Sequence, residues 1–365
     1  MLNLTLGGLS GGYRKYLQRL APLLSAHRDV EEVLQIVPAA YVSLPGLSAP
    51  SSWMPGEQWR GFPRLRHRVR EWRPDVVFIP TARYLDVGAP CVSMVRNMEP
   101  MLPATFREGV GPWAKSRLGA FLARNACRQS TRIIAVSAFV RDFLVNEWKV
   151  EPQKVGVVYH GIDEVTVVPA PSAKLNVRAP FLFAAGSLLA YRGLEDAITA
   201  LSRTSVPGLT LVIAGEGSAT YRERMQQLAT SLGVGDRLLW LGHLAEDDMS
   251  WAYSNCLAFV MTSRVEACPN TALEAMACGA VCISTRSLPM PEFFRQSALY
   301  YDAGDAEQLA AQIGKASSLD ADARFALQRT AKSRSMDFSW QRTANATVEQ
   351  LAHAISQSTL VAERR

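Results

Sequence analysis

The chain has 365 residues, a formal net charge of +6, and 48% apolar against 20% charged side chains. These proportions are typical of globular proteins and exclude a largely disordered chain. Because single hydrophobic cores rarely grow beyond about 250–300 residues, the length favours two domains. The charge is unevenly shared: residues 1–165 carry 21 Lys/Arg and 14 Asp/Glu, whereas the remainder carries 18 and 19. The basic first half therefore indicates an anionic partner or surface.

Cysteine usage and hydropathy indicate the cellular setting. Six scattered cysteines, with no CxxC pair and no clustered histidines, favour free thiols in a reducing cytosol over a disulfide scaffold or a zinc site. The first residues, Met-Leu-Asn-Leu-Thr-Leu-Gly-Gly, lack the basic region of a signal peptide. No apolar run approaches the ~18 residues that span a bilayer. We therefore expect a cytoplasmic protein that is soluble or attached peripherally to a membrane.

Short apolar runs alternate with amphipathic stretches along the chain. The expected strands are Leu2–Leu6, Val33–Val37, Val76–Ile79, Cys91–Val95, Ile133–Val136, Val155–Tyr159, Phe181–Ala185, Leu209–Ala214, Leu238–Leu241, Leu257–Met261 and Val281–Ser284. The expected helices include Gly12–Ala26, Gln58–Trp72, Trp113–Gln129 and one that contains Leu194, Ala197, Ile198 and Leu201. Continuous apolar strands that alternate with helices predict parallel sheets covered on both faces. Two such sets predict two Rossmann-like domains.

The domain boundaries follow from composition. The segment 164–180 contains three prolines and no clear period, so it is expected to link the domains. Beyond Asp305 the pattern is helical only and ends in a helix over Trp340–Ala362. The expected division is 1–165, 181–340 and a final helix over 341–365. The stretch Leu44–Gly56, rich in Pro and Gly, is expected to be a mobile loop.

One glycine-rich turn follows the first strand of each half. Gly7-Gly8-Leu9-Ser10-Gly11-Gly12 precedes a helix whose free N–H groups suit an anion. It is not G-x-G-x-x-G, and no acidic residue ends the second strand, so a plain tight turn explains it nearly as well. In the second half, Arg192 follows Gly186 and opens a helix, where a cation opposes the helix dipole. Arg192 either pairs with a diphosphate through two parallel hydrogen bonds or is a solvated side chain.

The strongest motif covers residues 263–279 and reads Ser-Arg-Val-Glu-Ala-Cys-Pro-Asn-Thr-Ala-Leu-Glu-Ala-Met-Ala-Cys-Gly. Pro269 suits the first turn of a helix. The N–H groups that would then be unpaired and able to bind phosphate are those of Asn270, Thr271 and Ala272. Glu266 is expected on the preceding loop. Glu274 would lie among apolar residues and needs a partner, either sugar or ribose hydroxyls or an internal Arg or backbone N–H.

A basic segment over Trp59–Trp72 has apolar residues at helical spacing. It contains Arg60, Arg64, Arg66, Arg68 and Arg70, and Arg73 directly follows it. Such a helix either lies on an anionic membrane or packs its apolar stripe on the sheet. The arginines would attract anionic lipid at about 1 kcal/mol each. Nucleic acid is not an expected partner, because no aromatic and basic binding motif accompanies the segment.

Glu266 and Glu274, with seven residues between them and followed by Ala-Met-Ala-Cys-Gly, resemble the signature of the retaining GT-B glycosyltransferases of family four, of the polysaccharide and O-antigen assembly type. Further landmarks follow in the family's order. They are Gly11-Gly12, Ala135–Arg141, His160–Asp163, Ala214–Gly217 and Leu241–Leu244. The resemblance implies an α/β protein of GT-B fold, in which two Rossmann-like domains with parallel sheets face a cleft. It also implies that the first domain binds the acceptor, that the second binds a nucleotide-sugar, and that the final helix crosses back to the first.

The resemblance further implies roles for individual residues. Arg192 would hold the diphosphate, Glu266 would orient the transferred sugar, and Glu274 would bind the ribose hydroxyls. The other implied donor-binding residues are Gly11, Gly12, Ser187, His243, Leu244, Asn270 and Thr271. Two positions depart from the family pattern. Family members often have Arg where this chain has Ser187, and many have His where it has Asn97. An Asn cannot act as a general base, so Asn97 is expected to hydrogen-bond a sugar hydroxyl at the catalytic centre.

The expected reaction is transfer of a hexose, with mannose as the first candidate, from a nucleotide-sugar to a saccharide or lipid-linked acceptor in cell-surface polysaccharide or lipopolysaccharide synthesis. The departing phosphate oxygen would take the acceptor proton on the same face, which gives retention; the alternative is a covalent intermediate on Glu266. No metal or other cofactor is expected, because the single Asp-x-Asp motif, Asp320-Ala321-Asp322, lies in a helical stretch.

Three alternatives remain open. The chain could have another GT-B activity, as a phosphorylase or a sugar-nucleotide epimerase, or it could be a degenerate homologue that binds a glycan or a partner. Peripheral attachment at the inner face of the cell membrane is expected through the basic N-terminal domain. Donor, acceptor, linkage and oligomeric state are left open.

Overall fold

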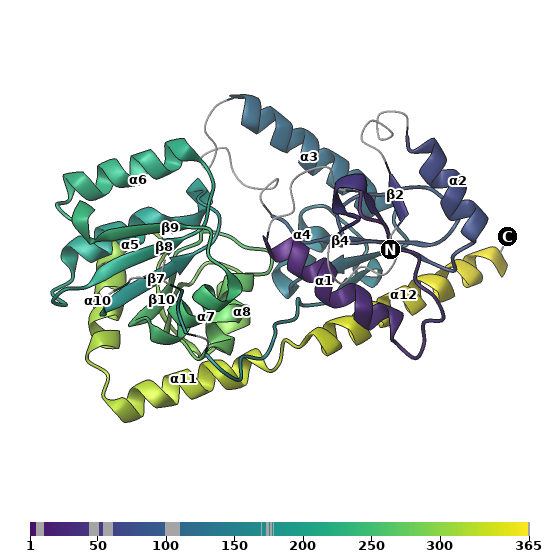
Figure 1. Cartoon of the computed structure of the whole chain (residues 1–365). Helices are drawn as coiled ribbons and strands as arrows, with labels where there is room; N and C mark the ends of the chain where they lie inside the picture. Colours follow the sequence, from purple (N-terminus) through teal and green to yellow (C-terminus); the bar gives the residue numbers. More distant parts are fainter. Residues whose placement is uncertain are drawn as a thin grey trace. The chain divides into compact units, whose positions relative to one another are not determined.

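The computed structural model describes residues 1–4, 11–43, 51–53, 61–98, 110–168, 170–172, 175, 177 and 179–363. The chain divides into two compact units (Figure 1). Unit 1 comprises Met1–Gly161 together with Trp340–Arg365, and unit 2 comprises Ile162–Ser339. Each unit contains a parallel sheet with helices, so the predicted α/β class with two parallel sheets is confirmed.

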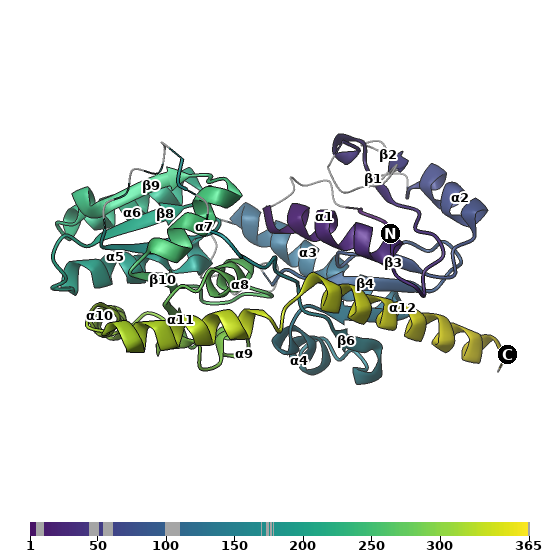
Figure 2. The same cartoon turned by 60° about the horizontal axis from the view of Figure 1, so that its bottom comes forward.

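Unit 1 is built around a four-stranded parallel sheet in the order β3-β4-β5-β6, with a two-stranded parallel pair β1-β2. Its helices are α1 (Gly11–Ser25), α2 (Pro63–Trp72), α3 (Val110–Gln129), α4 (Ala138–Asn146) and α12 (Trp340–Glu363). Its strands are β1 (Ile36–Pro38), β2 (Ser51–Trp53), β3 (Val77–Ile79), β4 (Cys91–Val95), β5 (Arg132–Ala135) and β6 (Val155–Val157). Short 3-10 turns cover Ala39–Tyr41 and Pro152–Lys154. The helix at the end of the chain, α12, packs against α1 and β5 (Figure 2).

The first expected strand of unit 1 is reduced to a bridge. Leu2 pairs in parallel with Ile36 and donates its N–H to the Phe78 carbonyl at 2.8 Å, so it connects β1 to β3. Residues 5–6 of the expected strand lie outside the described residues. The expected mobile loop Leu44–Gly56 is partly wrong, because β2 pairs with β1 within it. The expected helix over Gln58–Trp72 begins only at Pro63, where Pro takes its favoured place in the first helical turn.

Unit 2 contains a six-stranded parallel sheet in the order β12-β11-β10-β7-β8-β9. Its strands are β7 (Phe181–Ala185), β8 (Thr210–Ala214), β9 (Leu238–Gly242), β10 (Ala258–Met261), β11 (Cys282–Thr285) and β12 (Ala298–Tyr301). Its helices are α5 (Leu194–Arg203), α6 (Ala219–Ser231), α7 (Glu246–Asn255), α8 (Asn270–Ala277), α9 (Met290–Phe294), α10 (Ala306–Ser317) and α11 (Ala321–Ser335), with 3-10 turns η6 (Ala190–Arg192) and η7 (Gly235–Arg237). β12 was not among the expected strands; it is a four-residue edge strand in which only Tyr301 is fully buried.

Alternate residues of the unit 2 strands enter two different cores. Leu182, Leu211 and Ile213 pack with the apolar faces of α5, α6 and α10 in one buried cluster. On neighbouring positions, Phe183 and Phe259 contact the ring of Tyr253 on α7 at centroid distances of 5.1 and 5.3 Å. This alternation is the period-two pattern of a strand that is buried on both faces. It fixes the register of β7, β8 and β10 and therefore the positions of the loops that follow them.

The segment expected to link the domains packs in part on unit 2. Ser172 donates its N–H and its hydroxyl to the two carboxylate oxygens of Asp248, each at 2.8 Å. Leu175 is 4% exposed. The chain leaves unit 1 at Gly161 and returns to it at Trp340. None of the helices in the part of the chain that the structure describes is long and apolar enough to cross a membrane.

Candidate active site

Two loops meet at the carboxyl edge of the unit 2 sheet. β7 and β10 pair in parallel, but the chain continues from β7 to β8 on one side and from β10 to β11 on the other. Open α/β sheets bind ligands at such a switch point, because the loops that leave the two strands diverge there. The loop after β7 carries Arg192 and the loop after β10 carries Glu266. The topology therefore brings these two residues to one crevice.

The two loops are held together by their backbones. Gly193 has φ +62°, and a Cβ at this position would lie 2.6 Å from the Thr262 carbonyl oxygen, so the close approach requires glycine. Thr262 in turn donates its hydroxyl to the Arg192 carbonyl at 2.5 Å. The Arg264 N–H donates to the Tyr191 carbonyl at 2.8 Å. These contacts fix the loop after β7 against the end of β10.

Arg192 and Glu266 form an ion pair in this crevice. The Arg192 Nη1 and the Ser263 hydroxyl both donate to Glu266 Oε1, the latter at 2.9 Å. The side chains of Arg192 and Glu266 are 21% and 10% exposed. Arg192 Nε is buried and has no hydrogen-bond partner among the described residues. Arg192 is therefore not the solvated side chain that the sequence left as an alternative, and its Nε is a donor that no group in the described part of the chain uses.

Burial controls the protonation of this pair. Removal of the Glu266 carboxylate from water raises its pKa above the ordinary value, while Arg192 and Ser263 oppose the rise by stabilising the charged form. For Arg192, burial is the largest single influence and disfavours the charged form, but Glu266 and Tyr191 together outweigh it, and the pKa of the guanidinium is raised. The cation is thus retained at the crevice, next to a carboxylate that pays a desolvation cost.

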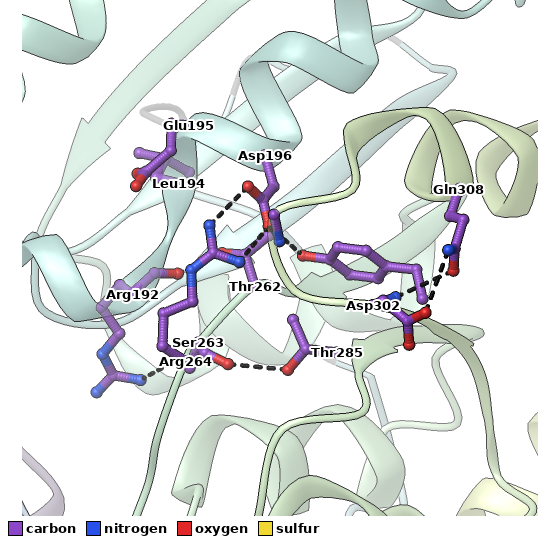
Figure 3. Close-up of polar contacts among 12 residues, drawn as sticks. Arg192, Leu194, Glu195, Asp196, Thr262, Ser263, Arg264, Thr285, Asp302 and Gln308 are labelled. Carbon is purple, nitrogen blue, oxygen red and sulfur yellow. Dashed lines mark hydrogen bonds and ion pairs between the residues drawn. The ribbon is translucent and has the colours of Figure 1, made fainter.

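A second buried ion pair supports the loop that carries Glu266 (Figure 3). Arg264 donates through both terminal nitrogens to the Asp196 carboxylate, each at 2.7 Å. Asp196, on the first turn of α5, also accepts from the Tyr301 hydroxyl at 3.2 Å and the Gly304 N–H at 2.9 Å. The Thr285 hydroxyl donates to the Ser263 carbonyl at 2.8 Å. The network therefore ties the loop after β10 to α5 and to the ends of β11 and β12.

The helix after the loop differs from the expectation at its start. α8 begins at Asn270 with Pro269 as its N-cap rather than inside the first turn. The Ala272 N–H donates to the Pro269 carbonyl at 2.9 Å, so it is not the free donor that the sequence analysis predicted. Asn270 and Thr271 open the helix, as expected. Glu274 accepts a hydrogen bond from the buried Tyr253 hydroxyl at 3.2 Å, a protein partner that was not among the alternatives.

The other expected donor-binding residues of unit 2 lie along the same edge of the sheet. Ser187 is exposed directly after β7, and His243 and Leu244 follow β9. The loops after β7, β8 and β9 contact one another, because the Gly215 N–H donates to the Gly242 carbonyl at 2.7 Å. A Cβ on Gly215, which has φ +135°, would lie 1.9 Å from the Gly186 carbonyl oxygen. The loops after β7, β8 and β9 therefore pack against one another along the carboxyl edge of the sheet.

Three expected site residues belong to unit 1. Gly11 and Gly12 begin α1, whereas residues 7–10 of the glycine-rich turn lie outside the described residues. Asn97 is exposed after the carboxyl end of β4. Its neighbour Arg96 stacks on the Tyr13 ring, with Cζ 3.5 Å from the centroid. Arg96 thus holds the loop that carries Asn97 against the start of α1.

Sequence reasoning assigned no role to several residues that shape this crevice. Ser263 and Arg264 were part of the motif, but nothing identified their partners. The sequence does contain an indication of the role of Asp196, because an acidic residue on the apolar face of α5 requires a buried partner. Tyr253 has no comparable signal. Among the described residues, no group of His, Cys, Asp and Glu is arranged to hold a metal ion.

Two parallel α/β units with a crevice at a switch point are the architecture of the GT-B class, and sequence comparison identifies the family as one of glycosyltransferases. Residues 19–165 match the model of Glycosyltransferase Family 4, and residues 170–334 match that of Glycosyl transferases group 1. Together the two matches cover most of both units. The chain therefore belongs to the group 1, family four glycosyltransferases, and the predicted family is confirmed.

Individual relatives agree with this assignment. The lipopolysaccharide core biosynthesis glycosyltransferase LpsE of Rhizobium meliloti is 29% identical over 256 residues, which cover 68% of this chain and 67% of LpsE. The serotype-specific mannosyltransferase WbdA of Escherichia coli is 29% identical over 149 residues, 40% of this chain and 18% of WbdA. HepE of Anabaena, solved in complex with UDP-glucose, superposes with a TM-score of 0.77 at 19% identity over 96% of this chain and 99% of HepE. The last comparison supports the fold.

Proposed function

We propose that this glycosyltransferase transfers a hexose from a nucleotide-sugar, with retention of configuration, to a saccharide or lipid-linked acceptor in cell-surface polysaccharide synthesis. The pairing of Arg192 with Glu266 at the switch point carries this proposal. The activity of LpsE and WbdA supports the acceptor class and makes mannose the first donor to test. UDP-glucose, the ligand of HepE, is the second.

The ion pair suits an exchange of partners. A diphosphate offers Arg192 two oxygens at the spacing of its fork, and Arg192 Nε is a buried donor with no protein partner among the described residues. When Arg192 turns to the diphosphate, Glu266 loses its counterion and becomes an acceptor for a hydroxyl of the transferred sugar. In this proposal the Glu266 carboxylate pairs with Arg192 in the free protein and binds the transferred sugar in the complex.

The other residues at the carboxyl edge of the unit 2 sheet complete the donor site in this proposal. The N-terminus of α8, at Asn270 and Thr271, stabilises negative charge on the departing phosphate together with Arg192. Glu274, held by Tyr253, accepts from the ribose hydroxyls. Ser187 contacts the diphosphate, and His243 and Leu244 lie by the base. In unit 1, Gly11 and Gly12 at the start of α1 offer backbone N–H groups that suit a phosphate, and the Asn97 amide can hydrogen-bond a sugar hydroxyl.

The proposed reaction needs no strong base. The departing phosphate oxygen takes the proton of the acceptor hydroxyl as the new glycosidic bond forms on the same face of the sugar, which accounts for retention. No metal is required, since Arg192 and the helix N-terminus supply the positive charge. Unchanged transfer in EDTA would support this mechanism. Trapping of a glycosyl ester on Glu266 would contradict it in favour of double displacement.

Donor binding is the first measurement. We expect one class among UDP-, GDP-, ADP- and dTDP-sugars to raise the melting temperature of the wild type, and Arg192→Ala and Glu274→Ala to abolish that rise. The matched control is Arg203→Ala on α5, which removes an exposed arginine paired with Glu307 and should leave the rise intact. Loss of the rise in the control as well would indicate a general effect of charge. No rise with any nucleotide would favour a degenerate, non-catalytic homologue.

A further inference from the structure

Helix α3 of unit 1 presents large apolar side chains to solvent. Leu118, Phe121 and Leu122 are 59%, 67% and 40% exposed, whereas its buried positions are Ala123, Ala126 and Cys127. A helix that packs on a sheet normally buries its large apolar residues and exposes polar ones. In α3 the small residues face the core and the large ones face outward. Single exposed apolar residues are ordinary, but a group of three on one helix face indicates a binding surface.

The three side chains form one stripe. Their spacing of i, i+3 and i+4 places them within about 100° of one another on a helix of 3.6 residues per turn. Lys115 lies beside Leu122 on one edge of the stripe, and Arg117 and Arg128 lie beside Phe121 on the other. All three cations are exposed. The surface is therefore apolar along its middle and cationic along both edges.

The cations of α3 have no acidic counterpart on the helix. Val110–Gln129 contains no Asp or Glu. Within the described part of the chain, Lys115, Arg117 and Arg128 form no ion pair. A surface of this composition is complementary to a layer that is apolar inside and anionic at its boundary, which is the interface of a bilayer that contains acidic lipids.

The basic helix that the sequence singled out does not have this arrangement. In α2, Leu65 and Val69 are each 2% exposed and pack in the core cluster with residues of β1 and β3. Leu65 and Val69 are thus covered by the sheet. The α2 side chains that face solvent are mostly charged, and the one large apolar residue among them is Trp72, 36% exposed at the end of the helix. Periodicity alone could not separate the two helices, because both have a regular apolar pattern.

We propose that the outer face of α3, formed by Leu118, Phe121 and Leu122 with Lys115, Arg117 and Arg128, inserts into the interface of an anionic bilayer. A second copy of the chain fits this face less well, because an isologous contact would bring like cations together. The proposal rests on this helix alone and holds whether or not the donor proposed above is right. It gives the basic unit 1 a specific point of attachment.

The test compares vesicle binding of matched variants. We expect the wild type to sediment with vesicles of phosphatidylcholine and phosphatidylglycerol and not with phosphatidylcholine alone. Leu118→Asp combined with Phe121→Asp should lower the partition coefficient at least tenfold. The control is Phe325→Asp on α11, which replaces a solitary aromatic residue that is 64% exposed and should change nothing. An Arg64→Glu, Arg68→Glu variant of α2 should reduce binding less than the α3 variant.

Several outcomes would overturn the proposal. They are wild-type binding to neutral vesicles alone, equal losses in the α3 and α11 variants, and a larger loss in the α2 variant. A wild type that is dimeric in sedimentation velocity, with a monomeric α3 variant that still binds vesicles, would assign the face to a protein contact. Melting temperatures show that each variant is folded, and binding should weaken as salt rises from about 0.1 to 1 M, since the Debye length falls from about 10 to 3 Å.

Discussion

Glu266 is a buried carboxylate whose desolvation lowers the stability of the folded state. Its carboxylate is 10% exposed and is balanced by one guanidinium and one hydroxyl. Burial raises its pKa, which means that the folded state prefers the neutral form more than the unfolded state does. The role proposed for Glu266 in the donor site accounts for a charge that the fold alone does not require.

This balance predicts the pH dependence of a neutral variant. Since the folded protein binds more protons than the unfolded one, wild-type stability falls as pH rises from the ordinary Glu value of 4.5 through the raised pKa. Glu266→Gln lacks this loss. We therefore expect its melting temperature to increase relative to the wild type as pH rises through that window, and then to stay level, while transfer is abolished. A difference that shrinks with rising pH would show that pairing with Arg192 outweighs burial.

At the scale of elements, the loop after β10 is positioned by Arg264 and Asp196. The bidentate ion pair joins this loop to α5, while Thr262 joins it to the loop after β7. Both Arg192 and Glu266 lie on segments that this network holds. We expect Arg264 to act as a positioning residue, although it makes no hydrogen bond to Glu266 itself.

The test uses two matched arginine variants of the same unit. Arg264→Lys keeps the charge but loses the bidentate contact. Arg324→Lys loses a similar contact to two carbonyls, that of Leu257, directly before β10, and that of Ala316 on α10. Each should lower the free energy of unfolding by about 1–3 kcal/mol. Only Arg264→Lys should also lower kcat, by about tenfold, with KM for the donor nearly unchanged. Equal kcat in the two variants would reduce Arg264 to a structural role.

The strands show where sequence patterns succeed. The expected Phe181–Ala185 and Cys91–Val95 agree with β7 and β4 residue for residue. The first is a continuous apolar run between Pro180 and Gly186, and the second is apolar except for Ser93 and directly follows Pro90. The short edge strands β2 and β12 were missed. An edge strand is defined by the neighbour to which it hydrogen-bonds, and that neighbour lies elsewhere in the sequence.

At the scale of the whole molecule, the chain passes between its units at two adjacent places. The Ile162 N–H donates to the Phe338 carbonyl at 2.7 Å, and Ile162 forms a bridge with Ser339. A Cβ on Gly161 would lie 2.5 Å from the backbone of Trp340. The expected landmark His160–Asp163 is therefore a site of close backbone packing, where His160 also contacts the Tyr16 ring at 4.8 Å.

This packing predicts opposite effects of two glycine substitutions. Gly161→Ala should lower the free energy of unfolding by about 1–3 kcal/mol, because the methyl group overlaps backbone atoms that cannot move aside. Gly314→Ala, inside α10 with no atom within 4 Å of the new Cβ, should raise it by about 0.5–1 kcal/mol. Chemical denaturation of both variants measures the difference. A stabilised Gly161→Ala variant would contradict the close contact with Trp340.

The sequence by itself determined the two parallel α/β sheets and most strand positions, because period and apolar continuity are properties of neighbouring residues. It also placed Arg192 and Glu266 on loops that follow strands. Only the tertiary structure decided their pairing across 74 residues and that of Arg264 with Asp196 across 68. It alone decided that α2 buries its apolar stripe while α3 exposes one. Such pairings depend on strand order and on which surfaces meet, and local periodicity carries no information about either.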